Sequence, residues 1–251
     1  MKALFLATAA VAAFAAAPAL AQDAIGSVGL GYTHSEVEGD NTDGAVIDGS
    51  VATSAFGDWT VTFDGSLNYS SQEDAFGDTT SAVAAHVSRL VNGVRIGGFV
   101  SVQNNELVDL ATIGIEAQKT FDQATLTGSV SYSDVADAEA WNAGIDAAYY
   151  PIEALRLNAG VAYASIDGDA LFGNDSLDSW TYGVGADYHF AETPYSVFAS
   201  YESTQFDDID VDVDAFKIGV RYNFGGNLQA QDRAGANIGR ATRSPVAVFG
   251  L

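Results

Sequence analysis

The strongest constraint on the fold is a strict alternation of apolar and polar residues that returns along most of the chain. From Trp59 to Tyr69, apolar residues occupy every second position, and Thr, Asp, Ser and Asn occupy the positions between them. The same period of two returns in 124–132, 180–190 and 216–224. Side chains of a β-strand point alternately to its two faces, so the pattern predicts strands with one apolar face.

Applied to the whole chain, this period predicts twelve strands, an even number, as a closed barrel with both chain ends on one side requires. The strands are expected at 24–34, 44–55, 58–70, 80–89, 94–103, 109–120, 123–133, 140–149, 154–164, 179–190, 194–202 and 214–224. The second, fourth and sixth are rich in Ala, Ser and Thr, so counts of ten and fourteen stay open. The predicted fold class is an all-β, transmembrane antiparallel up-and-down β-barrel.

The N-terminus has the layout of a secretory signal peptide. Lys2 gives a positive start, an almost unbroken apolar run reaches Ala17, and small residues precede a cleavage site after Ala21. Such a run is short for a transmembrane helix, and the absence of cysteine excludes a disulfide framework. We expect a signal peptide at 1–21, an outer-membrane barrel at 22–224 and a basic, flexible tail at 225–251, which could also enter the lumen as a plug.

The predicted connectors alternate in length and charge. Short turns are expected at 56–57, 90–93, 121–122, 150–153 and 191–193, and longer connectors at 35–43, 71–79, 104–108, 134–139, 165–178 and 203–213. With their flanking residues, the longer connectors hold two thirds of the acidic residues and no Lys or Arg. Short turns on one rim and longer loops on the other are typical of outer-membrane barrels.

Aromatic residues gather toward both ends of the predicted strands. Trp59 and Tyr69 lie ten positions apart on one apolar face, a length that crosses the hydrocarbon in a tilted strand. A soluble core would bury aromatics without ordering them into two rims. The expected interfacial aromatics are Trp59, Tyr69, Trp141, Tyr149, Trp180, Tyr188, Tyr222 and Phe224.

Together with a last strand that ends in Tyr222-Asn223-Phe224, these features make the chain resemble small Gram-negative outer-membrane porins. The resemblance implies an outer-membrane location and passive transport of small solutes. It covers nearly the whole mature chain, but it is architectural and does not identify the solute. The chain departs from larger porins in a short third connector, 104–108, and in continuing beyond Phe224.

The polar face of the strands carries charges of both signs. The expected pore-lining residues are Asp48, Asp64, Arg95, Glu116, Asp146, Arg156, Asp187, Lys217 and Arg221. Facing charges in a water-filled barrel could form an ion-selecting constriction. They could equally be ion pairs that hold opposite walls together.

His86 and Ser88 share one face of a predicted strand and resemble the His-x-Ser pair of outer-membrane lipases. The residues that follow, Arg89 and Leu90, depart from the lipase pattern, and a lumen-lining histidine is the simpler interpretation. We therefore expect no enzyme, no catalytic residues and no cofactor.

The connector 165–178 holds Asp167, Asp169, Asp175 and Asp178 but fails the EF-hand pattern, because Leu171 stands at a ligand position. Loose Ca²⁺ or Mg²⁺ binding stays open, although a solvated acidic loop is the simpler interpretation and no metal site is predicted.

The sequence holds 33 acidic and 10 basic residues, which argues against nucleic acid as a partner. The expected function is a porin-like channel for small hydrophilic solutes, biased toward cations at its outer mouth. The alternative is a non-conducting structural or surface-interaction barrel whose acidic loops bind lipopolysaccharide through divalent cations. Outer-membrane lipids are expected partners in both cases, and the oligomeric state stays open.

Overall fold

The computed structural model describes residues 24–70, 79–104, 109–135, 138–167, 176–207 and 211–239. The predicted signal peptide lies outside these residues, as do parts of the predicted longer connectors. In the described part of the chain, no helix is long and apolar enough to cross a bilayer.

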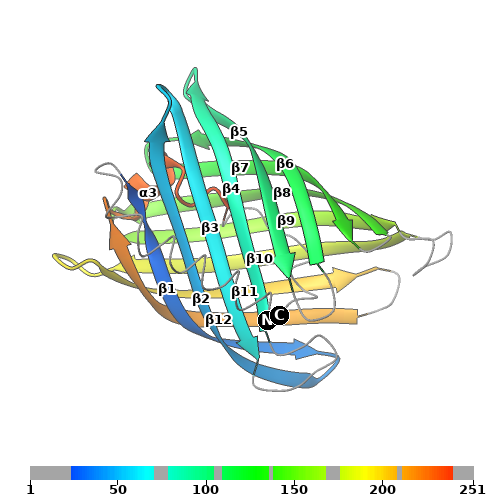
Figure 1. Ribbon diagram of the computed structural model, residues 1–251. Helices are drawn as coiled ribbons and strands as arrows, with labels where there is room; N and C mark the ends of the chain where they lie inside the picture. Colours follow the sequence, from blue (N-terminus) through cyan, green and yellow to red (C-terminus); the bar gives the residue numbers. More distant parts are fainter. Residues whose placement is uncertain are drawn as a thin grey trace.

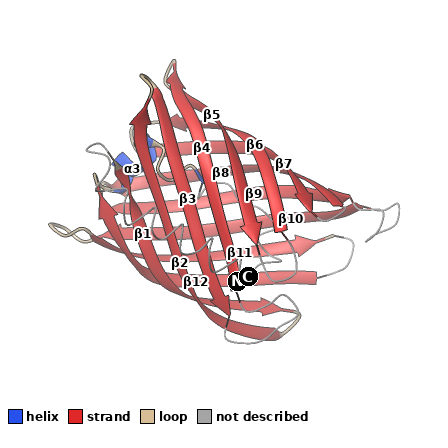
Figure 2. Ribbon diagram, viewed as in Figure 1, coloured by secondary structure: helices blue, strands red, loops and turns tan. Residues whose placement is uncertain are grey.

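Twelve antiparallel strands form one closed barrel, which confirms the predicted fold class and strand count (Figures 1 and 2). Each strand pairs with the next along the chain, and β12 pairs with β1 to close the sheet. The strands are β1 (Ile25–Val37), β2 (Asp40–Ala55), β3 (Trp59–Ser70), β4 (Thr79–Val91), β5 (Val94–Asn104), β6 (Asp109–Thr120), β7 (Ala124–Val135), β8 (Ala138–Ile152), β9 (Leu155–Asp167), β10 (Ser176–His189), β11 (Tyr195–Phe206) and β12 (Val211–Phe224). Closure leaves no sheet edge, so backbone groups find partners on both sides of each strand.

The alternation in the sequence separates the two faces of this wall. In β3 the side chains of Trp59, Phe63 and Tyr69 are exposed on the outside, whereas Thr62 and Ser70 are buried inside. The other strands expose large apolar side chains outward in the same way. An apolar outer face over a small, polar inner face is the arrangement of a barrel that stands in lipid.

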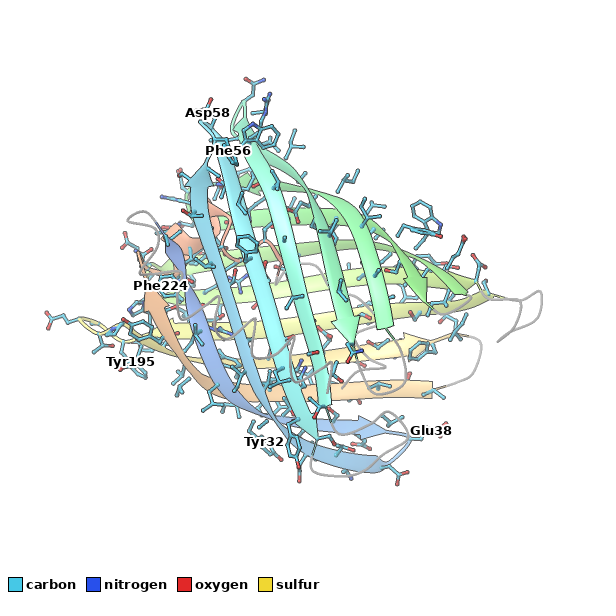
Figure 3. All side chains as sticks on the ribbon, in the orientation of Figure 1. Tyr32, Glu38, Phe56, Asp58, Tyr195 and Phe224 are labelled. Atoms are coloured by element: carbon cyan, nitrogen blue, oxygen red, sulfur yellow. The ribbon has the colours of Figure 1, made fainter. Side chains whose placement is uncertain are left out.

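One end of the barrel, called the turn end below, carries the short connections; the opposite end is called the loop end. At the turn end, Asn92 and Gly93 both have positive φ (51° and 75°), as an Asn-Gly hairpin turn requires. Figure 3 shows Phe56 and Asp58 at the tip of a turn-end hairpin and Glu38 at the loop end.

The loop end differs from the prediction because the strands run further than expected. Strands β1 and β2 continue through most of the predicted connector 35–43 and meet in a turn at Glu38 and Gly39. Strands β11 and β12 extend into the predicted connector 203–213 in the same way. Polar outward side chains cost little above the hydrocarbon, so the wall continues past it. The long loops predicted at these two places are therefore wrong.

The chain turns back into the barrel after β12. Helix α3 (Leu228–Ala234) starts at Asn227, whose side chain accepts a hydrogen bond from the backbone N–H of Ala230 (2.8 Å). It ends at Gly235, whose φ of 86° is accessible to glycine without strain. The sequence left open whether the tail 225–251 is flexible or enters the lumen as a plug. In the structure 225–239 lie against the inner wall at the turn end, and 240–251 lie outside the described residues.

Candidate functional site

The nine residues predicted to line a pore all lie on the inner face of the barrel. Six of them, Arg95, Glu116, Asp146, Arg156, Asp187 and Arg221, are buried there, and Asp48, Asp64 and Lys217 line an internal cavity. The wall between them consists mostly of Ser, Thr, Gly, Ala, Asn and Gln. The inner face is therefore polar, with short side chains around a few charged groups.

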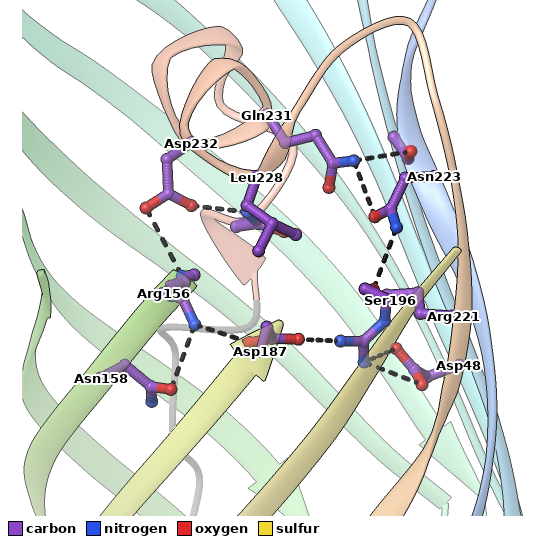
Figure 4. A network of polar contacts seen from close by, with 12 residues as sticks. Asp48, Arg156, Asn158, Asp187, Ser196, Arg221, Asn223, Leu228, Gln231 and Asp232 are labelled. Carbon is purple, nitrogen blue, oxygen red and sulfur yellow. Dashed lines mark hydrogen bonds and ion pairs between the residues drawn. The ribbon is translucent and has the colours of Figure 1, made fainter. Parts of the chain in front are cut away.

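Two arginines organise the charges of the inner wall (Figure 4). Arg221 on β12 donates to Asp187 (Nη1 to Oδ1, 2.6 Å) and to Asp48 (Nη2 to Oδ2, 2.9 Å). Arg156 on β9 lies 3.5 Å from Asp187 and 3.9 Å from Asp146. Asp187 therefore connects the two guanidinium groups, and of the two interpretations left open by the sequence, ion pairing describes this part of the lumen.

Helix α3 joins this network from the turn end of the lumen. The carboxylate of Asp232 lies 3.6 Å from Nε of Arg156 and accepts a short hydrogen bond from the hydroxyl of Tyr150. Asp232 and Tyr150 are both almost fully buried. Sequence reasoning missed both residues, although Tyr150 carried a signal: it is an aromatic residue in phase with the inward-facing Asp146 and Ala148.

Hydrogen bonds fasten the rest of the C-terminal segment, residues 225–239, to the wall. Gln231 donates to the carbonyl of Gly26 (3.1 Å) and to Asn223 Oδ1 (3.0 Å), and Asn223 in turn donates to Ser196 (3.0 Å). Arg95 donates to the carbonyl of Arg233 (2.8 Å) from the other side of the segment. These contacts with the segment come from β1, β5 and β12, so the segment is held from several sides of the lumen.

A cavity of about 410 Å³ lies inside the barrel, and Gly239 belongs to its lining. Its wall includes Asp48, Asp64, Asp187 and Lys217, together with small polar residues of β3, β5 and β11. A volume of this size holds a small solute. The C-terminal segment therefore borders the cavity and fills the lumen at the turn end.

His86 occupies the wall beside this cavity, between two carboxylates. Its Nδ1 lies 2.9 Å from Glu116 Oε2, and its Nε2 lies 3.1 Å from Asp64 Oδ2. The hydroxyl of Ser88 instead accepts a hydrogen bond from Arg95 (3.2 Å). The imidazole is thus directed at carboxylates and not at a serine nucleophile, which leaves the lipase-like alternative without support.

The loop end of the lumen has a different chemistry. Buried apolar residues on the inner face of β6 and β8–β12 form one cluster, called the apolar collar below: Leu110, Ala140, Ile166, Leu177, Phe206 and Val213. Val37 and Val211 pack against it. Leu110 and Ala140 lie in strands that the sequence predicted, whereas the other four lie in stretches predicted as acidic connectors, and the collar itself was not predicted. Its signal is the alternation of Val and Asp in 211–214, which places valines inside and carboxylates outside.

The acidic residues of the loop end point mostly away from the lumen. Asp212 and Asp214 share the outward phase of Phe216, and Asp167 follows the inward Ile166. Glu36 stands directly opposite Asp214 in the pairing of β1 with β12, and Glu139 stands opposite Asp167 in the pairing of β8 with β9. Among the described acids of this rim, Glu202 faces inward and lines the cavity.

Two tyrosines near the loop end hold outward carboxylates from the neighbouring strand. The hydroxyl of Tyr201 donates to Asp214 (2.7 Å), and that of Tyr32 donates to Asp43. Asp43, beyond the apolar band, also contacts His34 Nδ1 (2.8 Å). The hydrogen bond from Tyr32, followed by that from His34, lowers the pKa of Asp43 below its usual value.

The predicted interfacial aromatics all lie on the outer face. Tyr69, Trp141 and Trp180 stand toward the loop end, and Trp59, Tyr149, Tyr188, Tyr222 and Phe224 toward the turn end. Figure 3 shows Tyr32 pointing outward near the loop end and Tyr195 beside Phe224 near the turn end.

Within the described ranges, no three His, Asp or Glu side chains are grouped as a metal site requires. Of the four Asp considered for a loose Ca²⁺ or Mg²⁺ loop, Asp169 and Asp175 lie outside the described residues.

The model of a family described as outer membrane protein beta-barrel domain matches residues 82–224, more than half of the chain. Among solved structures, the fold is similar to the NanC porin (TM-score 0.59, 9% identity, covering 77% of this chain and 98% of that one). It is also similar to the COG4313 outer membrane channel of Pseudomonas putida F1 (0.59, 10%, 80% and 95%) and to the KdgM porin in complex with disordered oligogalacturonate (0.50, 12%, 80% and 99%). No curated protein sequence matches.

Proposed function

Because this chain belongs to the outer membrane protein beta-barrel domain family, we propose that it is an outer-membrane channel for the passive diffusion of small hydrophilic solutes. The protein is a small, porin-like barrel of the outer membrane, and the expectation that it is not an enzyme agrees with this family. The turn end, where β1 begins and β12 ends, then faces the periplasm, and the loop end faces outward.

The observation that carries the proposal is the internal cavity with its polar wall. Short side chains such as Ser66, Ser101 and Ser200 line it, and they leave space that long side chains would fill. Water and small polar solutes are stabilised by such a surface, because its hydroxyl and amide groups replace part of their hydration. The C-terminal segment then acts as a closure at the periplasmic end of this passage.

The pairing of the lumen arginines supports neutral or cationic solutes over polyanions. The KdgM porin was solved with oligogalacturonate, which is a polyanion. In this chain Arg156 and Arg221 direct their guanidinium groups at Asp48, Asp146, Asp187 and Asp232. Their charge is therefore offset within the wall and offers little attraction to an acidic saccharide.

A bias toward cations at the outer mouth is the finer part of the proposal. It is supported by the excess of carboxylates at the loop end and by Glu202, which faces the cavity. Lys217 makes no ion pair with any described residue and partly opposes this bias. The outward direction of most described rim acids weakens it further, so it should depend on the summed field at the mouth.

A second candidate is a non-conducting structural barrel whose outer rim binds lipopolysaccharide through divalent cations. The opposed acids Glu36 and Asp214, and Glu139 and Asp167, favour it, because like charges opposite one another in a sheet repel unless a cation lies between them. The segment that fills the turn end also favours it.

Conductance in planar lipid bilayers separates the two candidates. The full chain and a variant without 225–251 should be measured, with the reversal potential recorded in a KCl gradient at about 0.1 M and again near 1 M salt, because screening shortens from roughly 10 Å to roughly 3 Å. A channel gives stable current steps in at least one form, with a cation preference that fades at high salt. If neither form conducts, the channel proposal fails and the structural barrel replaces it.

A further inference from the structure

We propose that Lys217 on β12 and Glu202 on β11 form a subsite for a small zwitterionic solute such as an α-amino acid. The inference deepens the proposed function, on which it rests only for the route by which a solute reaches the lumen. Both side chains line the internal cavity and come from neighbouring strands. Together they present one positive and one negative group to the same space.

The pair lies between two parts of the lumen whose side chains already have partners. Inward residues of β12 at intervals of four are Arg221 in the ion-paired network, Lys217, and Val213 in the apolar collar. Four residues of a strand span about 13 Å, so Lys217 is well separated from both. The subsite is therefore a polar section of the wall in its own right.

Strand register brings the two charges close to each other without joining them. Lys217 is directly opposite Ser200, and Glu202 lies two positions further along β11 on the same face. With about 4.8 Å between strands and about 6.6 Å for two residues along one, the Cα atoms of Lys217 and Glu202 are about 8 Å apart. Both side chains are long enough to reach a ligand of a few atoms placed between them.

Lys217 is the inward base that lacks a partner in the wall. Among the residues that the structure describes, its ammonium group has no hydrogen bond or ion pair with another side chain. By contrast, Arg95, Arg156 and Arg221 each contact protein oxygens. Because Lys217 is half-buried, a ligand carboxylate would replace the hydration that its ammonium group has lost.

The chemistry of the pair selects the ligand. Glu202 has interactions of its own, but a carboxylate offers about four acceptor positions, so a further donor can be added. An α-amino acid carries a carboxylate for Lys217 and an ammonium group for Glu202, and the hydroxyl of Ser200 can donate to the same carboxylate. A solute with only one of these charges leaves the other wall residue unpaired and is repelled by it. The cavity of about 410 Å³ has room for such a molecule.

Binding is measured at equilibrium on the isotope-labelled full chain, refolded in detergent with the probe present, so that entry through the channel is not required. The probe is L-alanine, compared with L-alaninamide, which has only the positive charge, and L-lactate, which has only the negative one. The NMR signals of the backbone amides of 200–202 and 215–217 report occupancy. Alanine should bind about tenfold more tightly than either comparison compound, because each of those loses one charge-assisted hydrogen bond.

Variants test the two side chains separately. Lys217→Met and Glu202→Gln should each weaken the binding of alanine about tenfold. Lys119→Met, near the turn end of β6 and outside the cavity lining, is the matched control and should change nothing. Lys217→Glu combined with Glu202→Lys keeps one charge of each sign and should bind alanine again, whereas either reversal alone should not. The comparison of the three probes on the unaltered chain needs no variant, so the test stands even where a variant fails to fold.

Several outcomes would overturn the proposal. Equal binding of alanine and lactate would make Lys217 a simple anion site, and equal binding of alanine and alaninamide would make Glu202 a simple cation site. Undiminished binding of alanine to Lys217→Met, or no binding of alanine at all, would also remove the subsite. Saturable binding in a chain that does not conduct would contradict the proposed channel but leave the subsite intact, whereas conductance without binding would overturn the subsite alone.

Discussion

The two ends of the lumen are held by different interactions, polar and charged contacts at the turn end and apolar packing at the loop end. At the turn end, the C-terminal segment is fastened by charged and hydrogen-bonded groups, with Asp232, Arg156 and Tyr150 at the centre. At the loop end, the apolar collar packs side chains of neighbouring strand ends, such as Ile166, Leu177 and Phe206, against one another. An added segment is docked at the turn end, whereas the collar at the loop end consists of side chains of the wall itself.

This difference indicates which end can open. Apolar packing within the wall is non-directional, and undoing it means separating strands that also share backbone hydrogen bonds. The segment at the turn end has no strand pairing with the wall and depends on a small number of directional contacts. We therefore expect the turn end to control passage and the collar to stabilise the extended wall.

Removing the segment should have the largest effect. Deletion of 225–251 takes away the groups that fill the turn end, so conductance in planar bilayers should rise from little or none to stable open steps. A synthetic peptide of 225–251 added on the periplasmic side should close the truncated channel again. Equal conductance of the full and truncated chains would show that the segment does not limit passage.

The second largest effect is expected from the removal of one carboxylate, Asp232, at the turn end. Asp232→Ala removes the acceptor of the Tyr150 hydroxyl and of the Asn237 side-chain amide, and leaves Arg156 with one carboxylate fewer. Leaving buried donors without an acceptor should weaken the docking of the segment by about 1–3 kcal/mol. The docked segment should therefore detach part of the time, seen as faster trypsin cleavage after the neighbouring Arg233. Asp122→Ala is the control, because only the backbone carbonyl of Asp122 receives the bonds from Gln229 and Arg233. Equal cleavage of both variants would show that Asp232 does not hold the segment in the lumen.

A substitution in the apolar collar should lower the stability of the barrel and leave its conductance unchanged. Phe206→Ala removes a buried ring and should lower the free energy of unfolding by about 3–5 kcal/mol, measured by urea titration in detergent. Phe121→Ala, in an exposed turn, should leave stability nearly unchanged. If Phe206→Ala instead raised the conductance of the full chain, the collar would be a barrier and the comparison of the two ends would reverse.

The sequence predicted the barrel well because lipid allows so few solutions. Alternation fixed the strands and the inner position of residues such as Asp187 and Arg221, and turn chemistry such as Asn92-Gly93 fixed the hairpins. These signals are local, and closure of the sheet follows from them once the surrounding solvent is apolar.

The contents of the lumen could not be predicted in the same way. Which carboxylate pairs with Arg156 depends on the tilt of the strands and on the C-terminal segment, whose Asp232 lies 76 positions further along the chain. An alternation with a period of two gives information on neither. The loop end misled for another reason: acidic composition suggested solvated loops, whereas the valines between the acids, Val211 and Val213, keep the strand phase. The prediction at the loop end followed the acidic composition, whereas the alternation of valine and aspartate would have predicted the strand correctly.

The direction in which a rim acid points should decide its effect on selectivity. In the truncated, open chain, Glu202→Gln removes a carboxylate that lines the cavity, so the reversal potential in dilute salt should move toward anions. Asp212→Asn removes an exposed carboxylate that faces outward and should move it less. Equal shifts would mean that only the total charge of the rim matters.

The smallest expected effect concerns the exposed pairs outside the lumen, and it tests how far they resemble the buried network. Since the pKa of Asp43 is lowered in the folded protein, its ionised form contributes stability above the usual Asp range, and this contribution is lost as pH falls through the lowered pKa. Tyr32→Phe removes the larger of the two hydrogen bonds, so the pKa of Asp43, followed by NMR, should move back up toward its usual value. Tyr69→Phe, at an outward tyrosine on β3, should not move it.

Because the pair of Tyr32 and Asp43 is exposed, solvent and salt should limit its contribution to stability, so the thermal unfolding temperature should barely change in Tyr32→Phe. A large loss of stability would mean that the outer rim, like the turn end, is held by its polar contacts.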